Sequence, residues 1–510
     1  MDESRPMRVL LILAGSRTYF KWVSPPLGIL QLAGYLRNRL TNLEIRVVDQ
    51  RATNYTIEEV VSRAAGFAPD VVGISCTTSS SDVLGELSSS IRGALPQALL
   101  MIGGPHASAF GAELMDTTGA DCVVIGEGEL TCEHVLRIWQ ESSRDFSAVP
   151  GLVWRSTEGE CLTNPGPAPV IQDLDTLPFP AYDLIDVRSY WRLWSMSMLP
   201  PPRRYVSMFT SRGCPYRCIY CHEIFGKRFR AQSPERIVAE MEHYVRTYGI
   251  KEVEFFDDIF NLNGRRVIEF SELVRRRNLR VSISFPNAIR ADILTPEVAD
   301  ALAAAGTHMS ALALETGSPR IQELIQKRLN IPRYMEGVAM LAKRRVFTYG
   351  FVMFGFPTET AADMQMTVDM LRGSKLHALY SWIVTPYPKT ELFDMAMRLC
   401  PDKMAGIGYA GTDYFKYPCV NLSEVSDEVL AAYMRKAYSA LFLNPFRALR
   451  MVRDFPRPWS VVRYAPGVLV NITRSGHKYS QTKETAGMRS GNGITGDHAC
   501  VSERGNSGRE

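Results

Sequence analysis

Short hydrophobic runs alternate with amphipathic stretches over about the first 145 residues. Five runs are expected to be strands: "MRVLLILA", "EIRVVD", "DVVGISC", "ALLMIGG" and "DCVVIGE". Each of the first four is followed by a stretch of helical periodicity long enough to cross over. This α/β pattern predicts a doubly wound parallel sheet that is covered by helices on both faces. Ligands of such sheets bind beyond the carboxyl ends of the strands.

A second alternating region begins at Tyr205. Its six strand candidates are "RYVSMFTS", "EVEFFDD", "RVSISF", "MSALALE", "TYGFVMFG" and "YSWIVTPY". Two of the helical stretches between them begin Ser/Thr-Pro-Glu, which is typical of a capped helix N-terminus. Six such units predict a (β/α)6 partial TIM barrel with its reactive groups at the carboxyl ends of the strands.

The regions around these two units have a different composition. Pro-rich and turn-rich sequence between them predicts a linker with at most a small hairpin, and the last 35 residues lack apolar periodicity, which is typical of disorder. We therefore expect an N-terminal sheet domain, a linker, a barrel, a helical C-terminal region and a disordered tail, at residues 1–145, 146–204, 205–395, 396–475 and 476–510.

Bulk composition excludes several classes of protein. With 46% hydrophobic and 22% charged residues, the chain resembles an ordinary globular protein, and its formal charge of +4 gives no argument for nucleic acid. The N-terminus "MDESRPMRVLLILAGSR" places acids before a short apolar run, unlike a secretory signal, and we find no transmembrane segment. We expect a cytoplasmic protein with reduced cysteines.

Three cysteines lie in the stretch "TSRGCPYRCIYCHEIFG", directly after the first barrel strand. Cys214, Cys218 and Cys221 follow the spacing C-x-x-x-C-x-x-C. An iron–sulfur cubane normally takes four cysteines, so three leave one iron open for a substrate. The alternatives are a structural zinc site that also uses His222 and an incidental cluster. Structural zinc sites usually take their ligands as two separated pairs, which this loop does not supply.

The cysteine motif, with Tyr220 as its aromatic position, closely resembles that of radical S-adenosylmethionine enzymes. The resemblance extends over about residues 205–395 and implies a [4Fe–4S] cluster that binds S-adenosylmethionine. One-electron reduction, by a partner such as flavodoxin or ferredoxin, would release a 5′-deoxyadenosyl radical. Residues in the places of the family's cofactor contacts are Tyr220, Asp257, Asp258, Asn287, Arg290, Glu315, Gly355 and Pro386.

Each of these residues also has a purely structural explanation. Asp257 or Asp258 would cap the next helix, Arg290 would pair with Asp292, and the glycines would serve turns. Their positions at successive strand ends favour a cofactor site.

The N-terminal region lacks G-x-G-x-x-G after its first strand, which weakens a dinucleotide site. Ser75-x-Thr77 and Gly103-Gly104 instead resemble elements of cobalamin-binding domains, in which small residues admit the nucleotide tail. The cobalamin-binding residues that this resemblance implies are Ser16, Ser75, Thr77, Thr78, Gly103, Gly104, His106, Gly126 and Glu127. The alternative is that these residues serve only tight turns.

One feature departs from many cobalamin proteins. The D-x-H-x-x-G motif that supplies a cobalt-binding histidine is missing, and His106 lies among the tail contacts instead of in such a motif. Cys76 and Tyr19 are candidates to lie near the lower face of cobalt, and each is also explained by plain packing.

Both resemblances together imply a cobalamin-dependent radical S-adenosylmethionine methyltransferase that acts on an unactivated carbon of a small-molecule biosynthetic intermediate. The alternatives are a radical oxidative cyclase or rearrangement enzyme, and a non-catalytic metal-binding module.

The C-terminal "LFLNPFRALRMVRDFPRPWSVVRYAPG" mixes aromatic residues with arginines. It would line a pocket for a large apolar substrate, contact a membrane surface peripherally or form a packed helix with a basic outer face.

Overall fold

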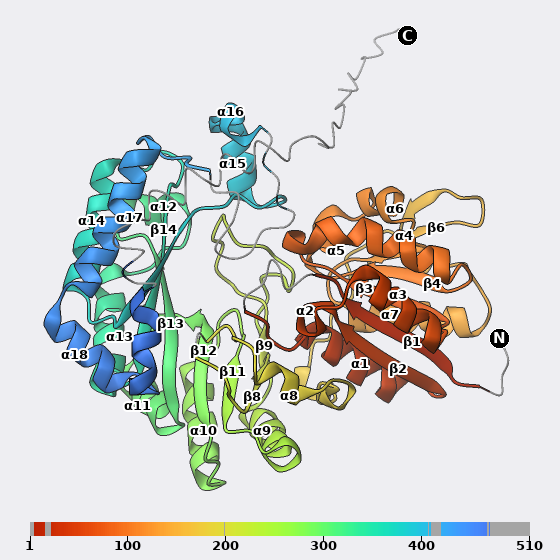
Figure 1. Cartoon of the computed structure of the whole chain (residues 1–510), viewed down its shortest axis with the longest axis horizontal. Helices are drawn as coiled ribbons and strands as arrows, with labels where there is room; N and C mark the ends of the chain where they lie inside the picture. The colour runs from red at the N-terminus through yellow and green to blue at the C-terminus, as the bar shows by residue number, and fades with distance from the viewer. Residues whose placement is uncertain are drawn as a thin grey trace, which may run out of the picture.

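The computed structural model contains two large sheets, one parallel throughout and one parallel in its first five strands, and each is flanked by helices (Figure 1). It describes residues 5–15, 22–197, 199–405, 407, 409, 420–466 and 469. Two residues of the predicted sites, Ser16 and Tyr19, and the tail expected to be disordered lie outside these residues.

The first sheet has the strand order β2-β1-β3-β4-β5-β6-β7. Its strands are β1 (Met7–Leu13), β2 (Leu43–Asp49), β3 (Val71–Ser75), β4 (Leu99–Gly103), β5 (Cys122–Val124), β6 (Leu152–Arg155) and β7 (Cys161–Thr163). The first five strands are parallel, as predicted.

Helices cover both faces of this sheet, because alternate side chains of its strands point to opposite sides. Val9 and Leu11 belong to the hydrophobic core on one face, and Leu10 and Ile12 belong to the core on the other. The helices are α1 (Leu27–Arg39), α2 (Gln50–Thr53), α3 (Ile57–Phe67), α4 (Leu84–Ala94), α5 (Pro105–Phe110), α6 (Glu113–Thr118) and α7 (Gly128–Gln140), with the 3-10 turn η1 (Thr78–Val83). This confirms the doubly wound fold.

The hairpin in the predicted linker belongs to the first sheet. Strand β6 pairs antiparallel with β5, and β7 pairs antiparallel with β6. The sheet therefore continues to Thr163. The rest of the connection contains short turns of helix, namely η2 (Leu174–Thr176), η3 (Tyr182–Leu184) and α8 (Val187–Tyr190).

The second sheet has the order β15-β14-β13-β12-β11-β8, and all of its strands are parallel. They are β8 (Tyr205–Met208), β11 (Glu252–Phe255), β12 (Ser282–Ile289), β13 (Thr307–Glu315), β14 (Phe347–Phe354) and β15 (Ala378–Ile383). Strands β8 and β15 are the edges of this sheet, so the barrel is partial, as expected.

The barrel helices are α9 (Pro234–Tyr248), α10 (Gly264–Arg276), α11 (Pro296–Ala304), α12 (Pro319–Leu324), α13 (Ile331–Lys343) and α14 (Ala361–Gly373), with the turn η4 (Ala291–Ile293). Ser233 and Thr295 accept hydrogen bonds from backbone N–H groups at the starts of α9 and α11. The Ser/Thr-Pro-Glu prediction of helix starts is thereby confirmed.

The C-terminal region is helical, as predicted, with α15 (Glu391–Leu399), α16 (Pro401–Met404), α17 (Asp427–Phe442), α18 (Pro445–Asp454) and η5 (Pro458–Tyr464). The basic outer face expected for its last helix is wrong in one respect, because α18 buries Arg447 and Asp454 and exposes apolar side chains. In the described part of the chain, no helix combines the length and the apolar character needed to span a membrane.

Candidate functional site

The cysteine loop, residues 213–229, is closed at its base by a two-stranded ladder. Strands β9 (Ser211–Arg212) and β10 (Arg230–Ala231) pair antiparallel on either side of it. Gly213 adopts a φ of +82° and faces the backbone of Arg228 so closely that a side chain has no room. Ile219 holds the middle of the loop, since its N–H donates to Ile325 at 3.1 Å and its carbonyl accepts from Leu392 at 2.9 Å. The backbone that carries the thiols is therefore fixed at both ends and at its centre.

The three thiols lie at the accessible side of this loop. Cys214 and Cys218 are half-buried, and Cys221 is exposed. Cys218 and Cys221 share a hydrogen bond, which lowers the pKa of Cys218 to about 6 and raises the pKa of Cys221, and the charge of Lys327 also lowers the pKa of Cys218. Thiolate is the form that binds iron, so the loop favours the reactive state of Cys218.

Among the described residues, no three His, Cys, Asp or Glu side chains are grouped so as to hold a single metal ion. In a cubane each cysteine binds a different iron atom, so the thiols need not converge on one point. The zinc alternative with His222 requires such convergence and gains no support here.

A lysine that the sequence analysis missed faces the cysteine loop. Lys327 donates to Glu315 at 2.8 Å, and its Nζ lies 3.3 Å from the hydroxyl of Tyr220. Glu315 and Lys327 are both buried. The ion pair connects the end of β13 to the aromatic position of the cysteine motif, and it brings together two of the predicted residues, Tyr220 and Glu315.

The two aspartates after β11 have different surroundings. Asp257 is buried and accepts hydrogen bonds from Thr210 N, Thr210 Oγ1 and Ser211 Oγ, whereas its Oδ2 has no partner among the described residues. Asp258 is exposed as a residue, but its carboxyl group is partly desolvated by the protein around it. This desolvation, together with the charge of Asp257, raises the pKa of Asp258 to about 6. The carboxylate of Asp257 therefore supports the strand preceding the cysteine loop, while Asp258 is open to a ligand.

The other predicted contacts have mixed surroundings. Asn287 is exposed and donates to the carbonyls of Phe256 and Asp257. Arg290 forms two hydrogen bonds with Asp292, as its structural explanation predicts. The backbone N–H of Gly355 donates to Glu359 at 2.7 Å.

Pro386 lies beyond β15, and its carbonyl accepts from Tyr409. These residues follow neighbouring strands, and their role in binding S-adenosylmethionine stays a prediction.

At the carboxyl edge of the first sheet, small residues meet without room to spare. Gly104 has a φ of +90°, and a Cβ there would lie 2.6 Å from Ser75 Oγ. The hydroxyl of Thr77 lies 3.1 Å from that of Ser79. Residue Gly103 accepts a backbone hydrogen bond from Cys76. At these positions, at the ends of β3 and β4 and directly after them, the edge therefore presents only small, uncharged side chains.

His106 and Cys76 are part of this edge but face inward. His106 is buried, which lowers its pKa to about 4, and its Nδ1 is 3.4 Å from Thr78 Oγ1. Cys76 belongs to the hydrophobic core, and its thiol donates to the carbonyl of Thr77. This environment fits the packing explanation for Cys76. Tyr19, the other lower-face candidate, lies outside the described residues.

A buried ion cluster joins the two sheets. Arg212 pairs with Glu127 at 2.6 Å and with Glu129 at 2.5 Å, and Arg230 pairs with Glu127. Burial alone would raise the pKa of Glu129, but Arg212 outweighs it and lowers that pKa. Both arginines flank the cysteine loop, and both glutamates follow β5. The ion cluster therefore brings the carboxyl ends of the two sheets together.

Glu127, which the sequence predicts to bind cobalamin, belongs to the ion cluster in the structure. Its carboxylate is fully engaged by two arginines, so its side chain supports the domain contact. Gly126, beside it, has a φ of +75°. The pairing of Glu127 with arginines more than 80 residues away has no local sequence signal.

The residues present fit both cofactor groups. Three thiols on a fixed loop would supply the ligands of a cubane with one open iron, and the bound cluster would reduce and cleave S-adenosylmethionine. The small, uncharged residues Ser75, Thr77 and Gly104 would suit close approach of a nucleotide tail, and bound cobalamin would carry a methyl group. The protein's own contribution is to orient these groups toward one another and to exclude water.

Comparison with known proteins is consistent with this geometry. The B12 binding domain family matches residues 17–136, and the Radical SAM superfamily matches residues 208–371. The chain is similar to the uncharacterized methyltransferase PH0819 of Pyrococcus horikoshii, with 30% identity over 451 residues that cover 86% of this chain and 93% of that protein. It is also similar to the anaerobic magnesium-protoporphyrin IX monomethyl ester cyclase of Rubrivivax gelatinosus, with 23% identity over 86% of this chain and 79% of that protein.

The fold is shared with OxsB, a cobalamin-dependent S-adenosylmethionine radical enzyme solved with aqua-cobalamin and S-adenosylmethionine bound. The TM-score is 0.70 at 14% identity, covering 95% of this chain and 80% of that chain. The structural match covers both sheets. The match to the Pyrococcus protein covers most of both chains. The chain therefore belongs to the family of cobalamin-dependent radical S-adenosylmethionine enzymes.

Proposed function

We propose that this enzyme transfers a methyl group from S-adenosylmethionine, by way of cobalamin, to an unactivated carbon of a small biosynthetic intermediate. The observation that carries the proposal is the ion cluster of Arg212 and Arg230 with Glu127 and Glu129. It supports a site in which a radical source and a methyl donor face the same substrate. Such a carbon lacks the nucleophilicity to attack a sulfonium methyl directly, so hydrogen abstraction must come first.

The similarity to PH0819 supports methyl transfer over cyclisation, because the relative called a methyltransferase shares 30% identity and the cyclase shares 23%. A one-electron reductant such as flavodoxin or ferredoxin would supply the electrons. The substrate itself is a small molecule of undefined structure.

The test uses the full chain, reconstituted anaerobically with iron, sulfide and cobalamin. The protein is incubated with S-adenosylmethionine labelled on its methyl group, a reductant and a metabolite extract from a strain that lacks the gene. We expect S-adenosylhomocysteine and 5′-deoxyadenosine to form together and the label to enter one metabolite through a new carbon–carbon bond.

Other products distinguish the alternatives. Formation of 5′-deoxyadenosine without S-adenosylhomocysteine would replace methyl transfer by oxidative cyclisation or rearrangement. Bound metal without reductive cleavage would leave only the non-catalytic module. Extract from the parent strain is the matched control, because it contains no accumulated substrate.

A further inference from the structure

Helix α18 has an inverted arrangement of polar and apolar side chains. Phe446 is 84% exposed and Leu449 is 71% exposed, and Val452 follows at the same helical spacing. Arg447, in contrast, is only 4% exposed. The helix thus presents an apolar stripe outward and a charged residue inward, the opposite of an ordinary surface helix.

The buried charged residues explain how this orientation is held. Arg447 donates to the carbonyls of Leu371, Arg372 and Ser374, at the C-terminus of α14, where helix carbonyls lack intrahelical partners. At the other end of α18, Asp454 pairs with His377 at 3.1 Å. Since both ends of α18 are attached by these contacts, the outward stripe is a fixed feature of the fold.

Further exposed apolar side chains lie in the same C-terminal segment, in which η5 contacts α18. Of the thirteen large hydrophobic side chains that the described residues expose most, seven lie between residues 443 and 469. Trp459, in η5, is 94% exposed. We define the α18 surface as Leu443, Phe446, Leu449, Val452, Trp459 and Val462. Concentrated exposure of this kind marks an interaction surface.

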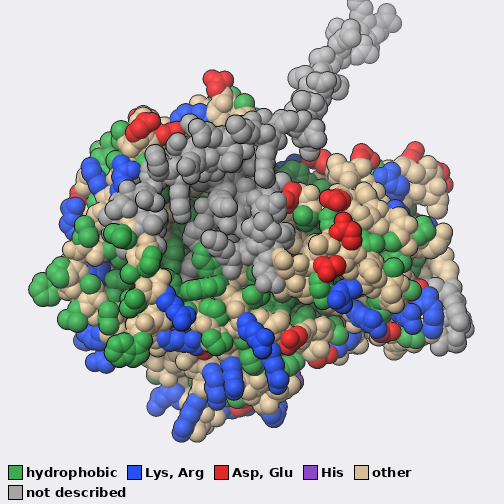
Figure 2. All heavy atoms as spheres, in the orientation of Figure 1, with side chains coloured by type: hydrophobic (Ala, Val, Ile, Leu, Met, Phe, Trp, Pro, Cys, Tyr) green, Lys and Arg blue, Asp and Glu red, His purple; other side chains and the backbone are tan. Residues whose placement is uncertain are grey.

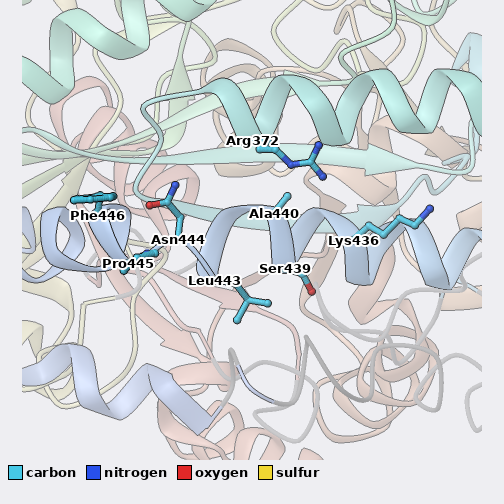
Figure 3. A pocket seen from close by; sticks show the side chains of 8 residues that line it. All are labelled: Arg372, Lys436, Ser439, Ala440, Leu443, Asn444, Pro445 and Phe446. Atoms are coloured by element: carbon cyan, nitrogen blue, oxygen red, sulfur yellow. The ribbon is translucent and has the colours of Figure 1, made fainter.

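The segment that carries the α18 surface has an excess of positive charge. Residues 443–466 include five arginines and one aspartate. Arg453 pairs with Asp454 and Arg457 pairs with Glu252, whereas Arg463 is exposed beside Val462. Figure 2 shows basic side chains interspersed with the hydrophobic ones on this side of the molecule. Beside the stripe, a hollow of about 610 Å³ is lined by Arg372 and Lys436 together with Leu443 and Phe446 (Figure 3).

We propose that the α18 surface docks this enzyme on membranes that contain anionic phospholipid. Exposed Trp, Phe and Leu flanked by arginines suit the boundary between headgroups and acyl chains. The hollow places Lys436 and Arg372, which also pairs with Asp369, next to apolar atoms, as a phosphate headgroup with its acyl chains requires. A second copy of the chain is disfavoured as the occupant, because two identical basic surfaces would repel each other.

The experiment is vesicle flotation of the reconstituted full-length protein. Vesicles of phosphatidylcholine alone are compared with vesicles that also contain phosphatidylglycerol. We expect binding to the anionic vesicles, weakened by salt. The double variant Phe446→Ser/Trp459→Ser should reduce binding by roughly tenfold or more, because it removes the two most exposed aromatic side chains.

Matched variants distinguish binding through the α18 surface from non-specific binding to vesicles. Met366→Ser/Leu399→Ser replaces exposed apolar side chains elsewhere and should leave binding unchanged. Lys436→Gln/Arg463→Gln should weaken binding to anionic vesicles, whereas Arg265→Gln on α10 should not. Cofactor absorbance and circular dichroism establish that every variant is folded.

The proposal is overturned if wild-type protein does not float with anionic vesicles, or if the Phe446→Ser/Trp459→Ser variant floats equally well. A dimer in sedimentation velocity that the same variant abolishes would assign the surface to a second copy instead. The inference does not depend on the proposed reaction, because flotation requires no turnover.

Discussion

The two sheet edges that the ion cluster joins are built from opposite kinds of residue. The barrel edge gathers reactive and charged groups, including the thiols, the Lys327–Glu315 pair and Asp258. The edge of the first sheet presents hydroxyls and glycines at Ser75, Thr77 and Gly104. One edge would supply ligands, and the other would supply a closely packed surface of small, uncharged residues. A substitution should therefore damage the barrel edge by removing a side chain and the first sheet by adding one.

The largest expected effect is at the barrel edge. Cys218→Ala removes one cluster ligand and should lower reductive cleavage of S-adenosylmethionine by at least about 100-fold, since even indirect partners of metal ligands often contribute 10–100-fold. The measurement is 5′-deoxyadenosine formation with iron content. Exposed Cys161 is the control, because Cys161→Ala should leave both unchanged. Retained cleavage in Cys218→Ala would contradict the assignment of the loop.

The ion cluster that joins the two edges comes next. Arg212→Met leaves Glu129 buried without its partner and should lower the free energy of unfolding by about 3–5 kcal/mol. Thermal unfolding measures this loss. Arg265→Met, which breaks an exposed pair with Glu269, should lower it by less than about 1 kcal/mol.

A double variant tests whether the loss comes from the stranded charge. Arg212→Met/Glu129→Gln should recover part of the stability, and an additive loss would mean that the two residues are uncoupled.

At the edge of the first sheet, Gly104→Ala should weaken cobalamin retention by roughly tenfold and leave cleavage of S-adenosylmethionine intact. The added methyl group strains a positive φ and meets Ser75 and Cys76, at a cost of about 2–4 kcal/mol. Absorbance of bound cobalamin is the measurement. Gly119→Ala shares a positive φ but has open space, so it isolates the backbone strain. If both variants weakened cobalamin retention equally, the close contact of Gly104 with Ser75 and Cys76 would not be the cause.

The smallest effect concerns a buried histidine. His106 has its pKa lowered from 6.5 to about 4, so between these values the unfolded chain binds a proton that the folded chain does not. Stability should fall as the pH drops below 6.5, and protonation of this residue in the unfolded chain should remove about 1.4 kcal/mol of stability at pH 5.5.

His106→Gln should reduce the difference in melting temperature between pH 7.5 and pH 5.5. His308, in the barrel, also has its pKa lowered to about 4 by burial, so His308→Gln should reduce the same difference. An unchanged pH dependence in His106→Gln would show that this histidine does not titrate differently on folding.

Features encoded by neighbouring residues were predictable from the sequence. The strands follow from apolar runs, and the thiols lie within eight positions of one another. The Lys327–Glu315 pair and the ion cluster connect distant segments, so no local spacing reveals them.

Helix α18 illustrates a different limit. Periodicity shows that a helix has two faces, but which face packs inward depends on partners elsewhere. Here Arg447 faces inward because the open carbonyls of α14 accept its hydrogen bonds. Likewise, the hairpin of β6 and β7 is short and is followed by Pro-rich sequence, so its place in the first sheet came only from the structure.

The four ion-paired side chains at the base of the cysteine loop also constrain protein engineering. Exchanging either half of this enzyme for that of a relative would separate two acids from two bases that form no other ion pair within the described part of the chain. A functional chimera must therefore carry a compatible quartet, whatever the similarity of the remaining surface.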